Sequence, residues 1–248
     1  EAPCGDGMYQ VASETVASTQ QTVADHLGAS PGEIALTEST VDGVNLVANA
    51  IDWQPGDVVV RPDFEHPAGM LPWRSLVDRA GIEVRVVATE GGRLDVDELA
   101  AAVDEDTRLV CTSSLTWSHG TRVPIPDVVD VAHEAGAQVL VDAVQSVGQQ
   151  PVDVDDWGAE FVAASGHKWL LGPWGAGFLY VDGDVVGDLA PGRIGYFGVE
   201  DPPGPGYEFN ADASRFHLGT TALGPKAGLR VGIEMIEAVG LPAIESRI

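Results

Sequence analysis

The feature of this chain that most constrains its fold is a regular alternation of short apolar runs with longer segments whose apolar residues recur at helical spacing. Short apolar runs bounded by turn residues are typical of buried strands. Strands that alternate with helices predict a three-layer αβα sandwich with a mostly parallel sheet. The expected strands are residues 33–37, 57–61, 82–87, 108–112, 138–142, 160–164 and 177–181, and the main expected helices are 11–27, 44–51, 71–80, 96–103, 126–135 and 224–240.

The chain shows no internal repeat, no low-complexity tract and no linker between comparable halves. The segment 201–206 is rich in proline and glycine and is therefore expected to be a loop. We expect residues 1–248 to form one large domain, with a final long helix that starts at about residue 224.

The charge is strongly negative, because 38 acidic residues stand against 13 basic ones, for a net charge of -25. The acidic residues are spread over the whole length, so nucleic acids and anionic membranes are poor partners. Such a surface fits a protein from a halophilic source, in which concentrated salt screens the self-repulsion. The alternative is an acidic protein from an ordinary environment, because charge determines solubility and not fold.

The sequence contains no uninterrupted apolar run of about 18 residues and begins without the basic and apolar blocks of a signal peptide. A cytoplasmic location is therefore expected. Cys4 and Cys111 cannot build a disulfide framework, and Cys111 lies in an apolar run where a thiol behaves as a small hydrophobic group. The six histidines show no metal-ligand spacing, so no metal is expected.

Chemistry is indicated by Lys168 in the segment Ser165-Gly166-His167-Lys168 and by Asp142 at the end of an apolar run. A lysine amine can hold pyridoxal phosphate as a Schiff base, and a buried carboxylate can keep the ring nitrogen of that cofactor protonated. Asp142 and Ser165 fall where predicted strands end, which is where ligands bind in such sheets. The alternatives are a solvated surface lysine and an aspartate that caps a helix.

Two further clusters follow predicted strands. Residues 38–43 combine hydroxyl groups with the unpaired backbone amides of a helix start, which is a natural phosphate cradle, although Ser39 or Thr40 could equally be an ordinary cap. His66 lies after the next strand, where an imidazole could lie flat against an aromatic cofactor. A solvated loop histidine is the alternative.

Together these motifs resemble the class V aminotransferase and cysteine desulfurase-like family of pyridoxal phosphate enzymes, the fold type I group. The resemblance spans about residues 30 to 240. It rests on the segments 39–45, 65–66, 71–73 and 141–145 and, most specifically, on Ser165-Gly166-His167-Lys168.

The resemblance implies that Lys168 is the Schiff-base lysine and proton shuttle and that Asp142 binds the pyridinium nitrogen. His66 would stack on the ring, and Gln145 would bond the phenolic oxygen. It also implies a homodimer with shared sites, in which Thr220 reaches the phosphate of the neighbouring subunit. The remaining implied phosphate ligands are Ser165, His167, Thr40 and Val41. The family often has a threonine where Val41 stands, so any contact of Val41 with the phosphate must come from its backbone.

Two departures from the family pattern leave the reaction open. Trp117 stands where desulfurases usually have asparagine, which fits either a subgroup with other substrates or a core position under the ring. The chain also stops soon after the long helix, before the smaller C-terminal domain of the family, which fits either a fragment or an incompletely represented protein. Transamination, elimination, sulfur removal and racemisation of an amino acid all remain open.

Two other classes of function compete with this interpretation. A binding or scaffold protein could keep the fold without the second domain, although the intact Lys168, Asp142 and His66 speak against a decayed site. A dinucleotide-binding oxidoreductase shares the alternation, but no Gly-x-Gly-x-x-Gly follows the first predicted strand.

Overall fold

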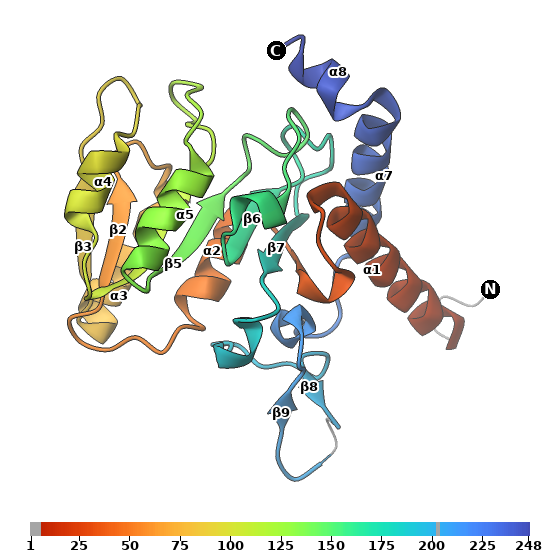
Figure 1. Ribbon diagram of the computed structural model, residues 1–248. Coiled ribbons are helices and arrows are strands. Elements are labelled where there is room, and N and C mark those ends of the chain that lie inside the picture. The colour runs from red at the N-terminus through yellow and green to blue at the C-terminus, as the bar shows by residue number, and fades with distance from the viewer. Residues whose placement is uncertain (1–5, 202–203) are drawn as a thin grey trace.

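The computed structural model describes residues 6–201 and 204–248, and Cys4 lies outside them. Its centre is a seven-stranded sheet with the order β1-β7-β6-β5-β4-β2-β3 (Figure 1). Strand β7 runs antiparallel to both of its neighbours, whereas the other pairs are parallel. The strands are β1 (Ile34–Thr37), β2 (Val58–Pro62), β3 (Glu83–Val87), β4 (Thr107–Ser113), β5 (Gln138–Asp142), β6 (Phe161–Ser165) and β7 (Gly177–Val181).

Helices cover both faces of the sheet and enclose two apolar cores, one on each face. The first core joins the sheet to α1, α4, α5, α6 and α7, and the second joins it to α2 and α3. This is the expected αβα sandwich. The helices are α1 (Asp6–Leu27), α2 (Thr40–Ala48), α3 (Leu71–Ala80), α4 (Val96–Ala102), α5 (Ile125–Glu134), α6 (Val154–Trp157), α7 (Leu223–Val239) and α8 (Leu241–Glu245).

The seven predicted strands are confirmed to within one residue at most ends, and so are most helices. Helix α2 starts four residues before the predicted position, because Ser39 caps it by accepting the Asp42 amide at 3.2 Å and its first turn is polar. The sequence did not predict the hairpin of β8 (Val199–Glu200) and β9 (Glu208–Phe209) that flanks the proline-rich loop. Two-residue strands are too short to show a period.

The carboxyl ends of the parallel strands meet at one edge of the sheet, which is the upper edge in Figure 1. Gly177 brings the ends of β1 and β6 together across the start of β7, since it pairs with both Thr37 and Ser165. A Cβ atom at Gly177 would come within 2.5 Å of the Ala164 carbonyl oxygen and 3.1 Å of Thr37 Oγ1. Only glycine allows this approach.

No helix among the described residues is both long and apolar enough to cross a bilayer. In the same residues, no three histidine, cysteine, aspartate or glutamate side chains gather as a group that could hold a metal ion.

Candidate active site

The end of β6 is bonded to the start of α2. Ser165 Oγ accepts a hydrogen bond from the Thr40 amide at 2.6 Å and lies 2.9 Å from Thr40 Oγ1. Both side chains are buried. The pair places two hydroxyl groups beside the N-terminus of a nine-residue helix, where backbone amides attract an anion. Two of the residues predicted to hold a phosphate are therefore neighbours.

Asp142 ends β5 and is buried between the two neighbouring strands. Its Oδ1 accepts the Val144 amide at 3.0 Å, and none of the described residues donates a hydrogen bond to its Oδ2. Burial raises the pKa of the Asp142 carboxyl to about 6, and the Val144 amide and the Lys168 ammonium partly offset that rise. A cationic ligand beside Asp142 would therefore lower the pKa of this carboxyl and favour its ionised form.

Lys168 lies in the turn that follows β6 and is half-buried. The turn is closed by two backbone hydrogen bonds, from the Leu171 amide to the Lys168 carbonyl at 3.2 Å and from the Gly172 amide to the Gly166 carbonyl at 2.8 Å. Leu171 adopts a φ of 55°, a left-handed conformation that is unusual for a residue with a side chain. Such strain is common at functional turns.

The Lys168 ammonium affects the pKa values of three titratable groups. Burial is the main cause of each pKa shift, and it lowers the pKa of His66 and His167 but raises the pKa of Asp142. The positive charge of Lys168 then lowers all three pKa values. Residues from three separate loops therefore converge on one amine.

His66 begins the short 3-10 helix η2 (Pro67–Gly69), and its Nδ1 accepts the Ala68 amide at 3.2 Å. An accepting Nδ1 together with a lowered pKa leaves the imidazole neutral. Trp117 meets this ring edge to face, with centroids 5.5 Å apart, and donates its indole N–H to the Phe64 carbonyl at 3.0 Å. Trp117 is 53% exposed and so is not part of the apolar core of the described residues.

The other predicted site residues differ in their surroundings. The His167 ring stacks on exposed Trp174 with centroids 4.1 Å apart. Gln145 is half-buried, and its Oε1 accepts the Trp169 indole N–H at 3.1 Å. Val41 is exposed in the first turn of α2, beside a cavity of about 530 Å³. Thr220 is exposed and contacts Tyr196, whose hydroxyl lies 3.1 Å from Thr220 Oγ1.

Glu65 is a buried acid to which the sequence assigned no role of its own. Its carboxylate accepts the Ser113 amide at 2.7 Å and the Ser113 hydroxyl at 2.8 Å. Burial raises the pKa of Glu65 to about 8, and the negative charge of Asp142 adds to that rise. The available signal was an acid directly after buried Phe64, next to a candidate site histidine.

The comparisons with known proteins agree with this geometry. The family model described as Aminotransferase class-V matches residues 6–248. The chain therefore belongs to the class V aminotransferase family, whose members use pyridoxal phosphate.

Individual relatives show which members of the family this chain is similar to. A probable cysteine desulfurase from Methanothermobacter thermautotrophicus is 38% identical over 98% of this chain and 62% of its own length. The apo structure of a cysteine desulfurase from Thermococcus onnurineus is 32% identical with a TM-score of 0.90, over 96% of this chain and 60% of that one. A C-DES variant with glycine covalently linked to its PLP cofactor is 27% identical with a TM-score of 0.92, over 100% of this chain and 66% of that one.

The chain thus spans about three fifths of the length of the curated relatives it matches. Within that span, the residues fit pyridoxal phosphate. A buried carboxyl offers an oxygen to which no described residue donates, a half-buried amine lies near it, and two buried hydroxyl groups adjoin a helix N-terminus.

Proposed function

We propose that this chain is the cofactor-binding part of a pyridoxal phosphate enzyme that breaks the carbon–sulfur bond of cysteine or a close analogue. The observation that carries the proposal is the convergence of Lys168, Asp142 and His66 at the carboxyl ends of the strands. Sulfur chemistry is supported by the relatives, which are named as cysteine desulfurases. A structural neighbour is a cystine C–S lyase in complex with cysteine persulfide.

Lys168 would hold the aldehyde of the cofactor covalently through its half-buried amine. In the reaction, Lys168 Nζ would take the proton from the α carbon of the substrate. When bound, the cofactor withdraws the electron pair that this proton leaves behind. Asp142 keeps the ring nitrogen protonated, which its buried carboxylate does well because the pair is shielded from water.

The remaining residues bind and orient. His66 would stack on the cofactor ring as a neutral imidazole, and Gln145 would bond its phenolic oxygen. The cradle at α2 would hold the phosphate through the hydroxyl groups of Thr40 and Ser165, the backbone at Val41, and His167.

A homodimer with shared sites is part of the proposal. Thr220 is exposed, so it is accessible to a neighbouring subunit, which supports this part. The exposed apolar side chains near it could take part in association. They are Ile194, Tyr196, Phe197 and Leu218.

Adaptation to concentrated salt is the last part of the proposal, and the net charge of -25 supports it. Salt screens the repulsion among the acidic side chains, so the free energy of unfolding should rise from low to molar potassium chloride. A flat or falling dependence of that free energy on salt contradicts this part.

The test of the activity begins with the protein loaded with pyridoxal phosphate in high salt. We expect a visible absorption band that borohydride reduction fixes onto the peptide containing Lys168. Incubation with L-cysteine and dithiothreitol, which supplies the two electrons that desulfuration to alanine requires, should then release sulfide. The three-carbon product distinguishes the reactions, since alanine indicates desulfuration and pyruvate indicates elimination, which needs no reductant. Attachment to a peptide without Lys168 would refute the assignment.

A further inference from the structure

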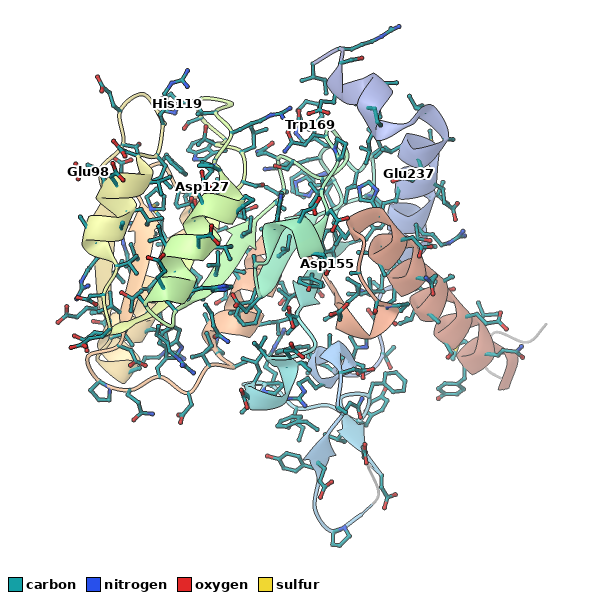
Figure 2. The ribbon with its side chains drawn as sticks, in the orientation of Figure 1. Glu98, His119, Asp127, Asp155, Trp169 and Glu237 are labelled. Carbon is teal, nitrogen blue, oxygen red and sulfur yellow. The ribbon has the colours of Figure 1, made fainter. Side chains whose placement is uncertain are left out.

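Trp169 directly follows Lys168, and its indole lies over the turn that follows β5. Figure 2 shows Trp169 among the loops beyond the strand ends. Its Nε1 lies 3.1 Å from Oε1 of Gln145. An indole nitrogen can only donate a hydrogen bond, so the amide atom that faces it must be the oxygen. The NH₂ group of Gln145 is therefore turned away from Trp169.

That NH₂ group is available to a ligand. Among the described residues, none accepts a hydrogen bond from Gln145 Nε2. Gln145 and Trp169 both line a cavity of about 430 Å³, together with Thr116, Trp117, Arg122 and Gln149. An amide with its oxygen fixed and its two N–H donors free is suited to bind an anionic oxygen.

The backbone holds Trp169 firmly against the turn that contains Gln145. Gly148 in that turn has a φ of 91°, and a Cβ atom there would come within 2.5 Å of the Trp169 carbonyl oxygen. The next residue, Leu170, is 1% exposed in the core. The backbone of Trp169 is therefore fixed against this turn, and the hydrogen bond to Gln145 holds the indole, which is 40% exposed.

We propose that Trp169 is a positioning residue, which orients the Gln145 amide so that its NH₂ group, and not its oxygen, faces the phenolic oxygen of the cofactor. The inference rests on the proposed function. The last torsion of a glutamine side chain is broad and roughly two-fold, so nothing within Gln145 itself favours this orientation. A rotated amide would oppose its carbonyl oxygen to the phenolic oxygen, and the two acceptors would repel each other.

The test is the pH at which the bound cofactor loses its proton, read from the visible absorption band. Donation to the phenolic oxygen stabilises the deprotonated form and so lowers this midpoint. Trp169→Phe keeps an aromatic ring and removes only the donor. We expect its midpoint to rise by about half a pH unit, which is the shift expected for one weakened hydrogen bond. Gln145→Leu should raise the midpoint at least as much.

Two further variants make the result specific. Trp53→Phe is the control, because Trp53 is half-buried and likewise donates its indole N–H to a carbonyl oxygen, that of Ala48, at 2.9 Å. Its midpoint should equal that of the unaltered protein. In the double variant Trp169→Phe with Gln145→Leu, the midpoint should equal that of Gln145→Leu alone, because Trp169 acts only through Gln145. Trp169→Tyr also lacks the N–H and serves if the phenylalanine variant does not fold.

The outcomes separate this inference from the proposed function. An unchanged midpoint in Trp169→Phe, additive shifts in the double variant, or an equal shift in Trp53→Phe would each overturn the positioning role while the Lys168-linked band remains. Failure of the unaltered protein to form that band refutes the proposed function itself.

Discussion

The two lysines of this chain lie in regions that differ in how their charges are arranged. Lys168 is half-buried beyond the end of β6, and its charge lowers the pKa values of Asp142, His66 and His167. Lys226 lies in the first turn of α7 and is more deeply buried, at 4% exposure. Its Nζ makes one long hydrogen bond, 3.4 Å to the Thr37 carbonyl.

The region around Lys226 differs in its acids, because Glu38 is exposed and Asp42 is half-buried, whereas Asp142 near Lys168 is buried. Burial lowers the pKa of Lys226, and the charges of Glu38 and Asp42 partly offset that shift. Its neighbour His217 has a pKa lowered to about 4, first by burial and then by the charge of Lys226, while its Nε2 accepts the Leu36 amide. No carboxylate of the described residues lies within 4 Å of the amine of Lys226 or of Lys168. Burial alone therefore does not mark the lysine proposed to act; the buried carboxyl of Asp142 and the two imidazoles near Lys168 distinguish it.

The largest effect is expected from removing each lysine in turn. Lys168→Ala should abolish the reducible cofactor band and lower turnover by about 10³-fold or more, because the covalent link and the proton shuttle are lost together. Lys226→Met should keep the band. Absorption spectra before and after borohydride reduction check both variants. Equal loss of the band in the two variants would contradict the assignment of the cofactor link to Lys168 alone.

The second effect concerns the acid that serves Lys168. Asp142→Asn should lower turnover by roughly 10²- to 10³-fold while cofactor still binds, because a neutral amide cannot hold the ring proton. Asp212→Asn is the corresponding change near Lys226, since Asp212 raises the pKa of His217 there. It should leave turnover within about two-fold, as expected for a site outside the chemistry. Steady-state rates with cysteine measure both, and full activity of Asp142→Asn contradicts its assigned role.

A third prediction follows from Glu65, the buried acid beside the Lys168 region. The folded protein holds a proton on Glu65 up to a pKa of about 8, whereas the unfolded chain releases it near the ordinary value of 4.5. The folded state therefore binds more protons between these two values, and stability should fall as the pH rises through that window. In the cofactor-free protein, we expect this loss to be roughly 2 to 4 kcal/mol.

Urea unfolding at the two ends of that window measures the loss. Glu65→Gln keeps the shape and removes the titration, so its free energy of unfolding should depend less on pH. Glu105→Gln is the matched control, because Glu105 is exposed. A pH dependence that is the same in Glu65→Gln and Glu105→Gln would mean that Glu65 is ionised in the folded protein throughout.

The sequence was sufficient to predict the sheet and the convergence of Asp142 with Lys168. Both follow from one rule, that parallel strands end at the same edge, and the apolar runs were clear enough to locate those ends. The bond from Glu65 to Ser113 was not predictable, because it depends on how the turn after β2 folds back onto β4. The contact between Trp169 and Gln145 likewise depends on the packing of two irregular turns.

The burial of Lys226 could have been predicted from spacing. Lys226 precedes Leu229 by three residues and Ile233 by seven, and both of these face the core on α7. The segment Ser165-Gly166-His167-Lys168 instead pointed to Lys168, whereas no such motif surrounds Lys226. Helical periodicity thus identified the buried face but said nothing about which polar residue on it would be tolerated.

The smallest effect is expected for the stability of Lys226→Met. A buried ammonium without a close carboxylate costs free energy, so an apolar side chain of similar length should leave the free energy of unfolding unchanged or raise it by about 1 kcal/mol at neutral pH.

Because the pKa of Lys226 is lower in the folded protein, the unfolded chain binds more protons between the two pKa values. The stability of the unaltered protein should therefore rise with pH across that alkaline window, and Lys226→Met should lose this rise. Urea unfolding at neutral and alkaline pH measures both quantities. If Lys226→Met instead lowered the free energy of unfolding by more than about 2 kcal/mol, the surroundings would stabilise the Lys226 ammonium. The two lysine regions would then differ less than the arrangement of charges indicates.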